Sequence, residues 1–325
     1  MNSDKGPIRI ELPTIFEMGT VNSYLFKDPE PTLIDCGEKS DASWKALLQG
    51  LKREGLVITD IERIIITHAH VDHMGMAAQV ADASGAKVWV SDMVKPWAVE
   101  LPRMQAERWD TIMTLLSEIT NKEDSPMHQG FAQFFNNYKS YWDPIPADII
   151  ETFSIDDKLS LGDGQWDVMY APGHCINQTC FYNKESKELI AADMLLRIAS
   201  TPVIDADLED PKKRAGGLAV MIETMKRFMQ LELQTVYPGH YDPIINGNAL
   251  LEKQLHRIDQ RIAQTYDLIS EGSKSFFEIL NSMYRGRVSG PAIPMMIGYL
   301  DVLLTKKMIS TSQSDVGLNY SIIAN

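Results

Sequence analysis

The stretch Ile64-Ile65-Ile66-Thr67-His68-Ala69-His70-Val71-Asp72-His73 decides both the fold and the chemistry expected of this chain. Three consecutive isoleucines are typical of a strand that is buried on both faces. The residues after them are expected on a loop at the sheet edge, where alternate side chains can converge. Imidazole and carboxylate groups bind zinc, iron or manganese. The stretch therefore predicts a metal site whose ligands are His68, His70, Asp72 and His73.

The residues around this stretch alternate between the patterns of strands and helices. Ser40 and Asp41 predict the start of an amphipathic helix, which Gly55 ends. The pattern becomes helical again from Met74 to Ala83, directly after the histidines. Short β-like runs precede both helices, at Ile8 to Leu12, Ser23 to Phe26 and Thr32 to Ile34. The order strand, loop, helix indicates an α/β fold.

Two more histidines, His174 and His240, each follow a Pro-Gly pair at the end of a strand-like run. A Pro-Gly pair predicts a tight turn, which aims the next side chain in a fixed direction. Asp193 ends a third such run, Ile190 to Ala192. Each of these residues alone is weak evidence for a metal ligand. The remaining histidines, His128 and His256, are expected to be ordinary packing or surface residues.

The combination of these motifs, in this order along the chain, resembles the metallo-β-lactamase superfamily over roughly residues 8 to 245. The resemblance implies an α/β fold, an αββα sandwich with the site at one edge of two packed sheets. It implies that His68, His70 and His174 hold one metal ion, that Asp72, His73 and His240 hold the other, and that Asp193 bridges them. Asp35 matches an early aspartate that supports the metal loop.

That resemblance also implies a mechanism. Two divalent ions, zinc or else iron or manganese, would share a hydroxide that attacks the substrate, and Asp72 would orient this hydroxide or accept a proton. The ligand set is similar to those of the glyoxalase II, lactonase and RNase-type branches. It differs from the antibiotic-degrading lactamases, which commonly place a cysteine where this chain has Asp193. Oxygen-reducing diiron proteins usually carry Glu in place of His70, and persulfide dioxygenases share only part of the pattern.

Residues 92–150 interrupt the α/β rhythm with helical patterns rich in aromatic residues and methionine. They are expected to form a helical insert that fills a small core of its own or caps the site with an apolar wall. Further on, Lys184 to Lys187 predicts a hairpin turn, and a long helix is expected near Pro211 to Leu231. Residues 1–248 are expected to form the catalytic domain.

The segment 249–325 is expected to be a small helical domain that resembles a winged helix. Its pattern is helical at first and then predicts a polar turn at Ser310 to Asp315, followed by a strand-like end. From Lys274 onward it carries five basic and three acidic residues, a surplus too small to indicate nucleic-acid binding. A docking or dimerisation role is the favoured interpretation, and a homodimer is one form that this role can take.

The composition is that of an ordinary globular protein, with 44% apolar and 23% charged residues. A net charge of −13 makes nucleic acid a less favoured partner, because phosphate-binding surfaces usually carry excess lysine and arginine. Three cysteines form no disulfide framework. The chain shows neither a signal peptide nor a long apolar run, and a cytoplasmic protein without membrane contact is expected.

The leading hypothesis is hydrolysis of an ester, lactone or thioester of a small apolar substrate, whose oxygen Arg197 and Tyr241 are expected to contact. Metal-dependent cleavage of RNA ranks second, because related enzymes carry similar C-terminal segments. A binding or regulatory protein without catalytic activity is the third interpretation, and the complete ligand set weighs against it.

Overall fold

Two six-stranded sheets form the centre of the computed structural model, which describes residues 6–120, 126–198, 200–210, 213–315 and 317–323. The first sheet has the order β1-β2-β3-β4-β5-β6. Its β1 and β2 form an antiparallel hairpin beside β3, and β3 to β6 are parallel to one another. The bounds are β1 Ile8–Pro13, β2 Thr20–Phe26, β3 Thr32–Ile34, β4 Arg63–Ile65, β5 Lys87–Ser91 and β6 Ile150–Phe153.

The second sheet has the order β12-β11-β10-β9-β8-β7. Only β10 and β11 are parallel in it, and the other neighbouring strands are antiparallel. Residues 184–187 connect β9 to β10, which confirms the predicted hairpin. The bounds are β7 Lys158–Leu161, β8 Gly164–Tyr170, β9 Thr179–Asn183, β10 Glu188–Ala192, β11 Thr235–Pro238 and β12 Ile244–Ile245.

Side chains from both sheets share one apolar core, so the sheets face each other. Ile65 of β4 packs in this core with Trp166 of β8 and Phe181 of β9. Ile64 and Ile66 point to the other face of the first sheet, where they pack under the helices. The isoleucine run is therefore buried on both faces, as its composition predicts. Helices α1 (Asp41–Arg53), α2 (Val71–Met74) and α3 (Ala77–Ser84) belong to this outer layer.

The start of α1 shows how local sequence determines an element boundary. Ser40 has an extended backbone, and its hydroxyl accepts a hydrogen bond from the backbone N–H of Ser43. Such an N-cap is worth about 1 kcal/mol, because it satisfies a helix N–H that has no partner within the helix. Leu47 and Leu51, one turn apart, are buried, and Gly55 follows the helix with a positive φ of 80°. Both predicted ends of this helix are confirmed.

The second sheet is covered by α7 (Gly217–Phe228) and α8 (Gly247–Ser270), which completes the αββα sandwich. The start of the helix expected near Pro211 to Leu231 lies outside the described residues. Among the described residues the helix is shorter than predicted, because α7 begins only at Gly217. The described residues before it run irregularly from Asp193, with an isolated bridge between Ala206 and Arg214. Within the described part of the chain, no helix is both long and apolar enough to cross a membrane.

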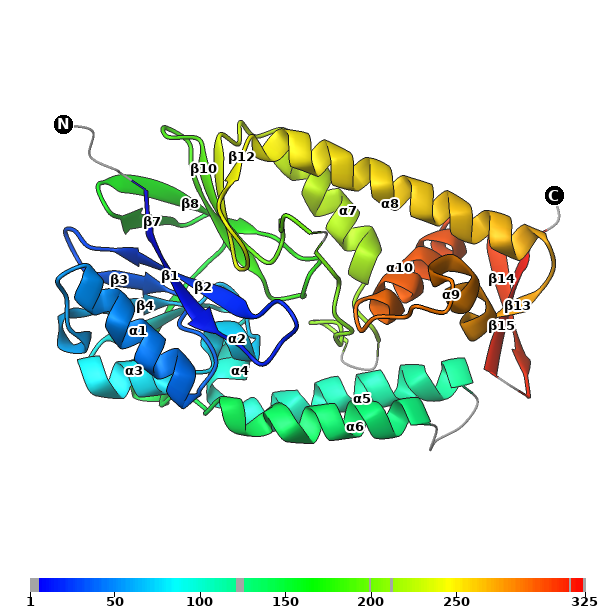
Figure 1. Cartoon of the computed structure of the whole chain (residues 1–325), viewed down its shortest axis with the longest axis horizontal. Coiled ribbons are helices and arrows are strands. Elements are labelled where there is room, and N and C mark those ends of the chain that lie inside the picture. Colours follow the sequence, from blue (N-terminus) through cyan, green and yellow to red (C-terminus); the bar gives the residue numbers. More distant parts are fainter. Residues whose placement is uncertain (1–5, 121–125, 199, 211–212, 316, 324–325) are drawn as a thin grey trace.

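The segment between β5 and β6 is helical, as its sequence predicts. It holds α4 (Lys95–Val99), α5 (Leu101–Thr120) and α6 (Pro126–Tyr138). Figure 1 shows α5 and α6 side by side, running beneath the molecule from the sheets to the C-terminal elements. Trp109 of α5 stacks on Phe135 of α6, with ring centroids 5.0 Å apart. The insert is therefore a pair of packed helices that extends from the two sheets to the C-terminal elements.

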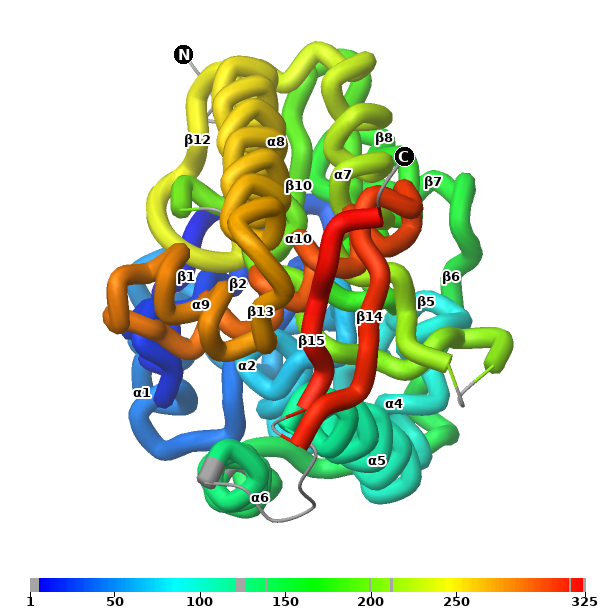
Figure 2. Tube along the Cα trace, turned by 90° about the vertical axis from the view of Figure 1, so that its right-hand side faces the viewer, coloured from blue at the N-terminus to red at the C-terminus, as the bar shows by residue number. Residues whose placement is uncertain are grey.

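The C-terminal elements are α9 (Phe276–Tyr284), α10 (Ala292–Thr305) and a small sheet of β13 (Lys274–Ser275), β15 (Gly317–Ile322) and β14 (Ile309–Ser314). The predicted polar turn at Ser310 to Asp315 is wrong, because most of it is strand β14. That strand lies at the edge of its sheet and most of its side chains are exposed, so its polar composition resembles that of a turn. Figure 2 shows the β14–β15 hairpin reaching α5. The division into domains at residue 248 stays a prediction.

Candidate metal centre

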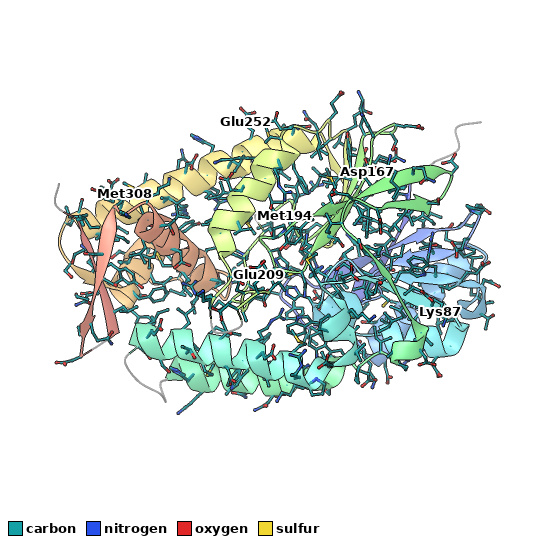
Figure 3. The ribbon with its side chains drawn as sticks, turned by 180° about the vertical axis from the view of Figure 1, so that it is seen from behind. Lys87, Asp167, Met194, Glu209, Glu252 and Met308 are labelled. Atoms are coloured by element: carbon teal, nitrogen blue, oxygen red, sulfur yellow. The ribbon has the colours of Figure 1, made fainter. Side chains whose placement is uncertain are left out.

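The seven predicted ligands come together from four loops, each at the end of a strand. His68, His70, Asp72 and His73 follow β4, and His174 follows β8. Asp193 comes directly after β10, and His240 comes shortly after β11. Asp35 follows β3, the parallel neighbour of β4. Figure 3 shows Met194, the residue after Asp193, near the middle of the molecule. The strand ends thus position all these side chains at one edge of the sandwich.

A first cluster consists of His68, His70, His174 and Asp193. Nδ1 of His70 lies 3.0 Å from Nε2 of His68 and 3.0 Å from Nε2 of His174. Oδ2 of Asp193 lies 3.4 Å from Nε2 of His174. These separations match the edge of about 3.3 Å between two ligand atoms bound to one tetrahedral zinc ion.

A second cluster consists of Asp72, His73 and His240. Nε2 of His240 lies 3.4 Å from Oδ2 of Asp72, and Nε2 of His73 lies 4.0 Å from the same oxygen. Asp193 reaches this cluster as well, with its two carboxylate oxygens 3.4 Å from Nε2 of His73 and from Nε2 of His240. Asp193 is therefore the side chain that contacts both clusters, the place expected of a bridging ligand.

Four of the histidines are oriented in the same way. The Nδ1 atoms of His174 and His240 lie 2.7 Å from the carbonyl oxygens of Thr201 and Thr20. The Nδ1 of His73 lies 2.7 Å from the carboxylate of Asp35, and the Nδ1 of His68 lies 2.9 Å from the hydroxyl of Thr67. A carbonyl oxygen only accepts, so an N–H at Nδ1 leaves Nε2 directed at the centre. These contacts pre-orient the ligand atoms.

The pKa values of the clustered histidines shift in two opposite directions. Burial lowers the pKa of His68 and His70 well below the usual value, and it also lowers the pKa of His174. Burial alone would lower the pKa of His73, but the charges of Asp193, Asp35 and Asp72 raise it to about 10. The pKa of His240 is raised in the same way, mainly by Asp193. The negative charge of Asp193 and its neighbours thus favours positive charge at His73 and His240, which a divalent ion can also supply.

The residues present fit two divalent metal ions. Nε2 of His73, Nε2 of His240 and Oδ1 of Asp193 are buried and make no hydrogen bond within the described part of the chain. Buried polar atoms normally have a partner, and a set of imidazole and carboxylate atoms around one point is the donor set of a metal ion. Zinc, iron and manganese all accept these donors, so the geometry does not select among them.

Asp35 holds the metal loop in place. Its carboxylate accepts hydrogen bonds from the backbone N–H of Thr67 at 2.9 Å and from the hydroxyl of Thr67 at 2.7 Å, and it contacts His73. Its own backbone lies in the left-handed region, with φ of 57°. This geometry agrees with the supporting role that the resemblance implies.

Replacing Asp35 by asparagine is expected to lower metal affinity about 10-fold to 100-fold, because the amide no longer orients His73 through a charged hydrogen bond. Competition with a chromophoric chelator measures the affinity. Asp82→Asn, at an exposed position of α3, is the matched control and should bind metal as the unmodified protein does. Equal affinity in Asp35→Asn would contradict the supporting role.

Gly239 shows why a glycine precedes His240. A Cβ atom at this position would lie 2.1 Å from Oδ1 of Asp193 and 2.8 Å from Cε1 of His73. Both distances are too short for carbon, so any side chain would displace Asp193 of the first cluster and His73 of the second. The Pro-Gly pair therefore gives close packing against the metal ligands in addition to the turn that the sequence predicts.

We expect Gly239→Ala to bind metal at least about 10-fold more weakly, since the added methyl moves Asp193. Metal analysis after gel filtration measures the loss. Gly130→Ala on α6 is the control, because a Cβ there meets open space and alanine favours a helix. Unchanged metal content in Gly239→Ala would show that the site tolerates the shift.

A cavity of about 300 Å³ opens onto the metal clusters. His70, Asp72, His174 and Asp193 form its polar end. Its remaining wall is largely apolar and comes from the β1–β2 loop, the helical insert, the loop after β10 and the C-terminal segment. The apolar lining residues are Phe16, Met18, Val71, Trp109, Ile112, Phe131, Phe134, Phe135, Trp142, Val203, Ile204, Gly290 and Pro294. The insert thus lines the site, although the sequence left open whether it would.

The structure does not bring the two predicted substrate contacts to this cavity. Arg197 is exposed on the loop after Asp193, and Tyr241 is half-buried beside His240. Neither is among the described residues that line the cavity, where Arg108 of α5 is found instead. Sequence reasoning missed Arg108 because nothing in its local pattern differs from a helix-surface arginine. His128 and His256 lie outside the clusters, as expected.

Comparison with known proteins agrees with this geometry. Residues 17–240 match the family model described as the metallo-beta-lactamase superfamily. The probable metallo-hydrolase YqjP of Bacillus subtilis is 26% identical over 315 residues, which cover 94% of each chain.

Two crystal structures share the fold over nearly the whole chain. A metallo-beta-lactamase family protein of Thermus thermophilus superposes with a TM-score of 0.78 at 20% identity, over 98% of this chain and 99% of that one. A beta-lactamase domain protein of Burkholderia ambifaria also gives 0.78, at 19% identity, over 99% and 93%. The family-model match agrees with the αββα sandwich and with the strand ends that carry the predicted ligands. The chain belongs to the metallo-beta-lactamase superfamily of metal-dependent hydrolases.

Proposed function

We propose that this chain is a dinuclear metal hydrolase that cleaves an ester, lactone or thioester of a small apolar substrate. The observation that carries the proposal is the cavity, where ligands of both clusters lie at the end of an aromatic and aliphatic wall. Sites of this kind bind small molecules through apolar contacts and orient them through a few polar groups. The relative YqjP, whose name is probable metallo-hydrolase, supports the hydrolase class.

The division of work within the site follows from its residues. Two bound ions would supply Lewis acidity and lower the pKa of a water molecule. The Nδ1 contacts of His73, His174 and His240 hold their rings in a fixed orientation, so little reorganisation is needed during reaction. Asp72 is nearly buried at the cavity wall, where its carboxylate can orient an attacking water or hold its proton. The apolar wall excludes bulk water.

Cleavage of RNA, the second hypothesis, receives no support from this cavity. A volume of about 300 Å³ is at the small end of the range for ligand sites, and the wall is aromatic and aliphatic. Proteins that bind nucleic-acid strands use positively charged grooves, and the chain carries a net charge of −13. The cavity therefore favours a small molecule over an RNA strand as the substrate.

The test is hydrolysis of p-nitrophenyl acetate and octanoate, an acyl lactone, an acyl thioester and an RNA oligomer by the purified protein. We expect turnover that favours the longer acyl chain, disappears with a chelator and returns with zinc, manganese or ferrous iron. Turnover that resists the chelator would overturn the proposal, and so would cleavage of RNA alone.

A matched pair of variants on α5 tests the apolar wall. Ile112 lines the cavity, and Thr114 lies on the same helix beside a surface groove. Ile112→Glu should suppress octanoate hydrolysis about 10-fold or more, because a carboxylate in the apolar wall loses its hydration. Thr114→Glu should leave this hydrolysis unchanged. If both variants hydrolyse the octanoate ester at the same rate, the acyl chain does not bind against the wall that Ile112 lines.

A further inference from the structure

Arg108 is a buried cation in a wall that is otherwise mostly apolar. Its residue is 7% exposed, and it is the one lysine or arginine among the described residues that line the cavity. It lies on α5 and lines the same cavity as His70 and Asp193, and its charge is among those that act on His70. An arginine in this position is within reach of any substrate that occupies the cavity.

The arginine is held rigidly. Its Nε donates a hydrogen bond to Oδ1 of Asp205 at 2.7 Å, and the partner side chains are 8% and 5% exposed. The guanidinium also lies over the ring of Trp97, 4.0 Å from its centroid. The other oxygen of Asp205 accepts a hydrogen bond from the backbone N–H of Ile176, which is two residues after His174. The guanidinium is thus fixed relative to the metal centre.

Stability alone gives little reason for this ion pair. Burial of two charges costs several kcal/mol each, and a well-packed apolar pair in the same place is often equally stable. A guanidinium, however, has five N–H donors in a planar fork, so it can serve Asp205 through one edge and a second acceptor at the same time. Carboxylates fit this fork with two parallel hydrogen bonds.

The overall charge adds a further argument. A protein with a net charge of −13 repels anionic ligands at long range, so a site for an anion needs a local cation. The scissile group would already be polarised by bound metal ions, and a cation on the cavity wall is more useful to a second group. Arg108 therefore fits an anionic oxygen that lies apart from the bond to be cleaved.

Building on the proposed function, we propose that the substrate is an amphipathic acid: an apolar body that carries the ester, lactone or thioester and, at a distance from it, a carboxylate bound by Arg108. Trp97 and Asp205 are positioning residues for this arginine. The apolar wall of the cavity holds the chain between the carboxylate and the scissile bond.

Two esters of equal chain length test the proposal. Mono-p-nitrophenyl adipate ends in a carboxylate, and p-nitrophenyl hexanoate ends in a methyl group. The unmodified protein should prefer the adipate ester at least about 10-fold in kcat/KM, as one charge-assisted hydrogen-bonded pair provides. The double variant Arg108→Met, Asp205→Asn removes both charges of the ion pair, so no unpaired charge is left. In this variant the preference should disappear, because KM should rise for the adipate ester and stay unchanged for the hexanoate ester.

Further variants separate recognition from folding. Arg108→Gln with Asp205→Asn keeps a hydrogen-bonded pair without charge, and it should lose the preference as well. Arg108→Lys keeps the charge and should retain part of it. Arg103→Met, at an exposed position five residues earlier on α5, is the control and should behave as the unmodified protein does. An equal loss for both esters would mean that Arg108 acts on the scissile oxygen, and that result overturns the proposal.

A binding experiment distinguishes this inference from the proposed function. Adipamic acid and hexanamide are stable amides of the same length, and calorimetric titration of the metal-loaded protein gives the Kd of each. Adipamic acid should bind at least about 10-fold more weakly to the Arg108→Met, Asp205→Asn variant than to the unmodified protein, and hexanamide should bind both equally. If no ester is hydrolysed but this difference appears, the function is wrong and the anion site stands. If esters are hydrolysed and the difference is absent, the anion site is wrong.

Discussion

Replacing His70 by alanine should remove bound metal and reduce ester hydrolysis at least about 100-fold. The expected loss exceeds the 10-fold to 100-fold effect that is usual for residues behind a ligand, because Nδ1 of His70 lies between the Nε2 atoms of two other histidines. Without this atom, the first cluster retains two imidazoles and one carboxylate. Elemental analysis gives the metal content, and the ester panel gives the rate.

The control for this variant is His256→Ala. His256 is exposed on α8 and contacts Gln260, away from the clusters. It should keep the metal content and the rate of the unmodified protein. Circular dichroism must show that His70→Ala is folded, and a folded His70→Ala protein with full metal content and rate would contradict the assignment of His70 as a ligand.

The second large effect is expected at Asp193. Asparagine has nearly the same shape as aspartate, so Asp193→Asn removes the charge and leaves the packing almost intact. Because Asp193 contacts histidines of both clusters at 3.4 Å, we expect the metal content to fall from about two ions to one or fewer. The rate should fall by about 100-fold to 1,000-fold, as it does when a charge-stabilising group is removed from a preorganised site.

Glu209→Ala is the matched control for Asp193→Asn. This exposed carboxylate lies on the same irregular segment between β10 and α7, as Figure 3 shows. It should change neither metal content nor rate. Two ions and full activity in Asp193→Asn would show that a neutral oxygen is sufficient between the clusters, and the bridging assignment would then fail.

Much of the fold could be predicted because local patterns carry its information. The isoleucines before His68 alternate between two apolar cores, and the Ser40 cap begins a helix through a contact three residues away. Such signals depend on neighbours in the sequence. The polar strand β14 was missed because its exposed edge position, and not its composition, makes it a strand.

The candidate site also has one part that local sequence patterns predict and another part that they do not. His68, His70, Asp72 and His73 lie within six residues, and this spacing by itself indicates a metal. His174, Asp193 and His240 could be assigned only through their order and the family resemblance, since no local rule states which strand ends meet. The structure places all seven at one edge, and their role as ligands stays a prediction that the variants above test.

Periodicity and spacing in the sequence were sufficient to predict the α/β class of the fold and the loop that carries the first four predicted ligands. The class of chemistry followed from the family resemblance. Which side chains line the cavity depends on the tertiary packing. Arg197 and Tyr241 are close to predicted ligands in the sequence but are not among the described residues that line the cavity. Arg108 lines it, although it lies 35 residues after His73, the predicted ligand nearest to it in the sequence. A cavity wall is assembled from segments that are distant along the chain, so its composition follows from packing and not from any local pattern.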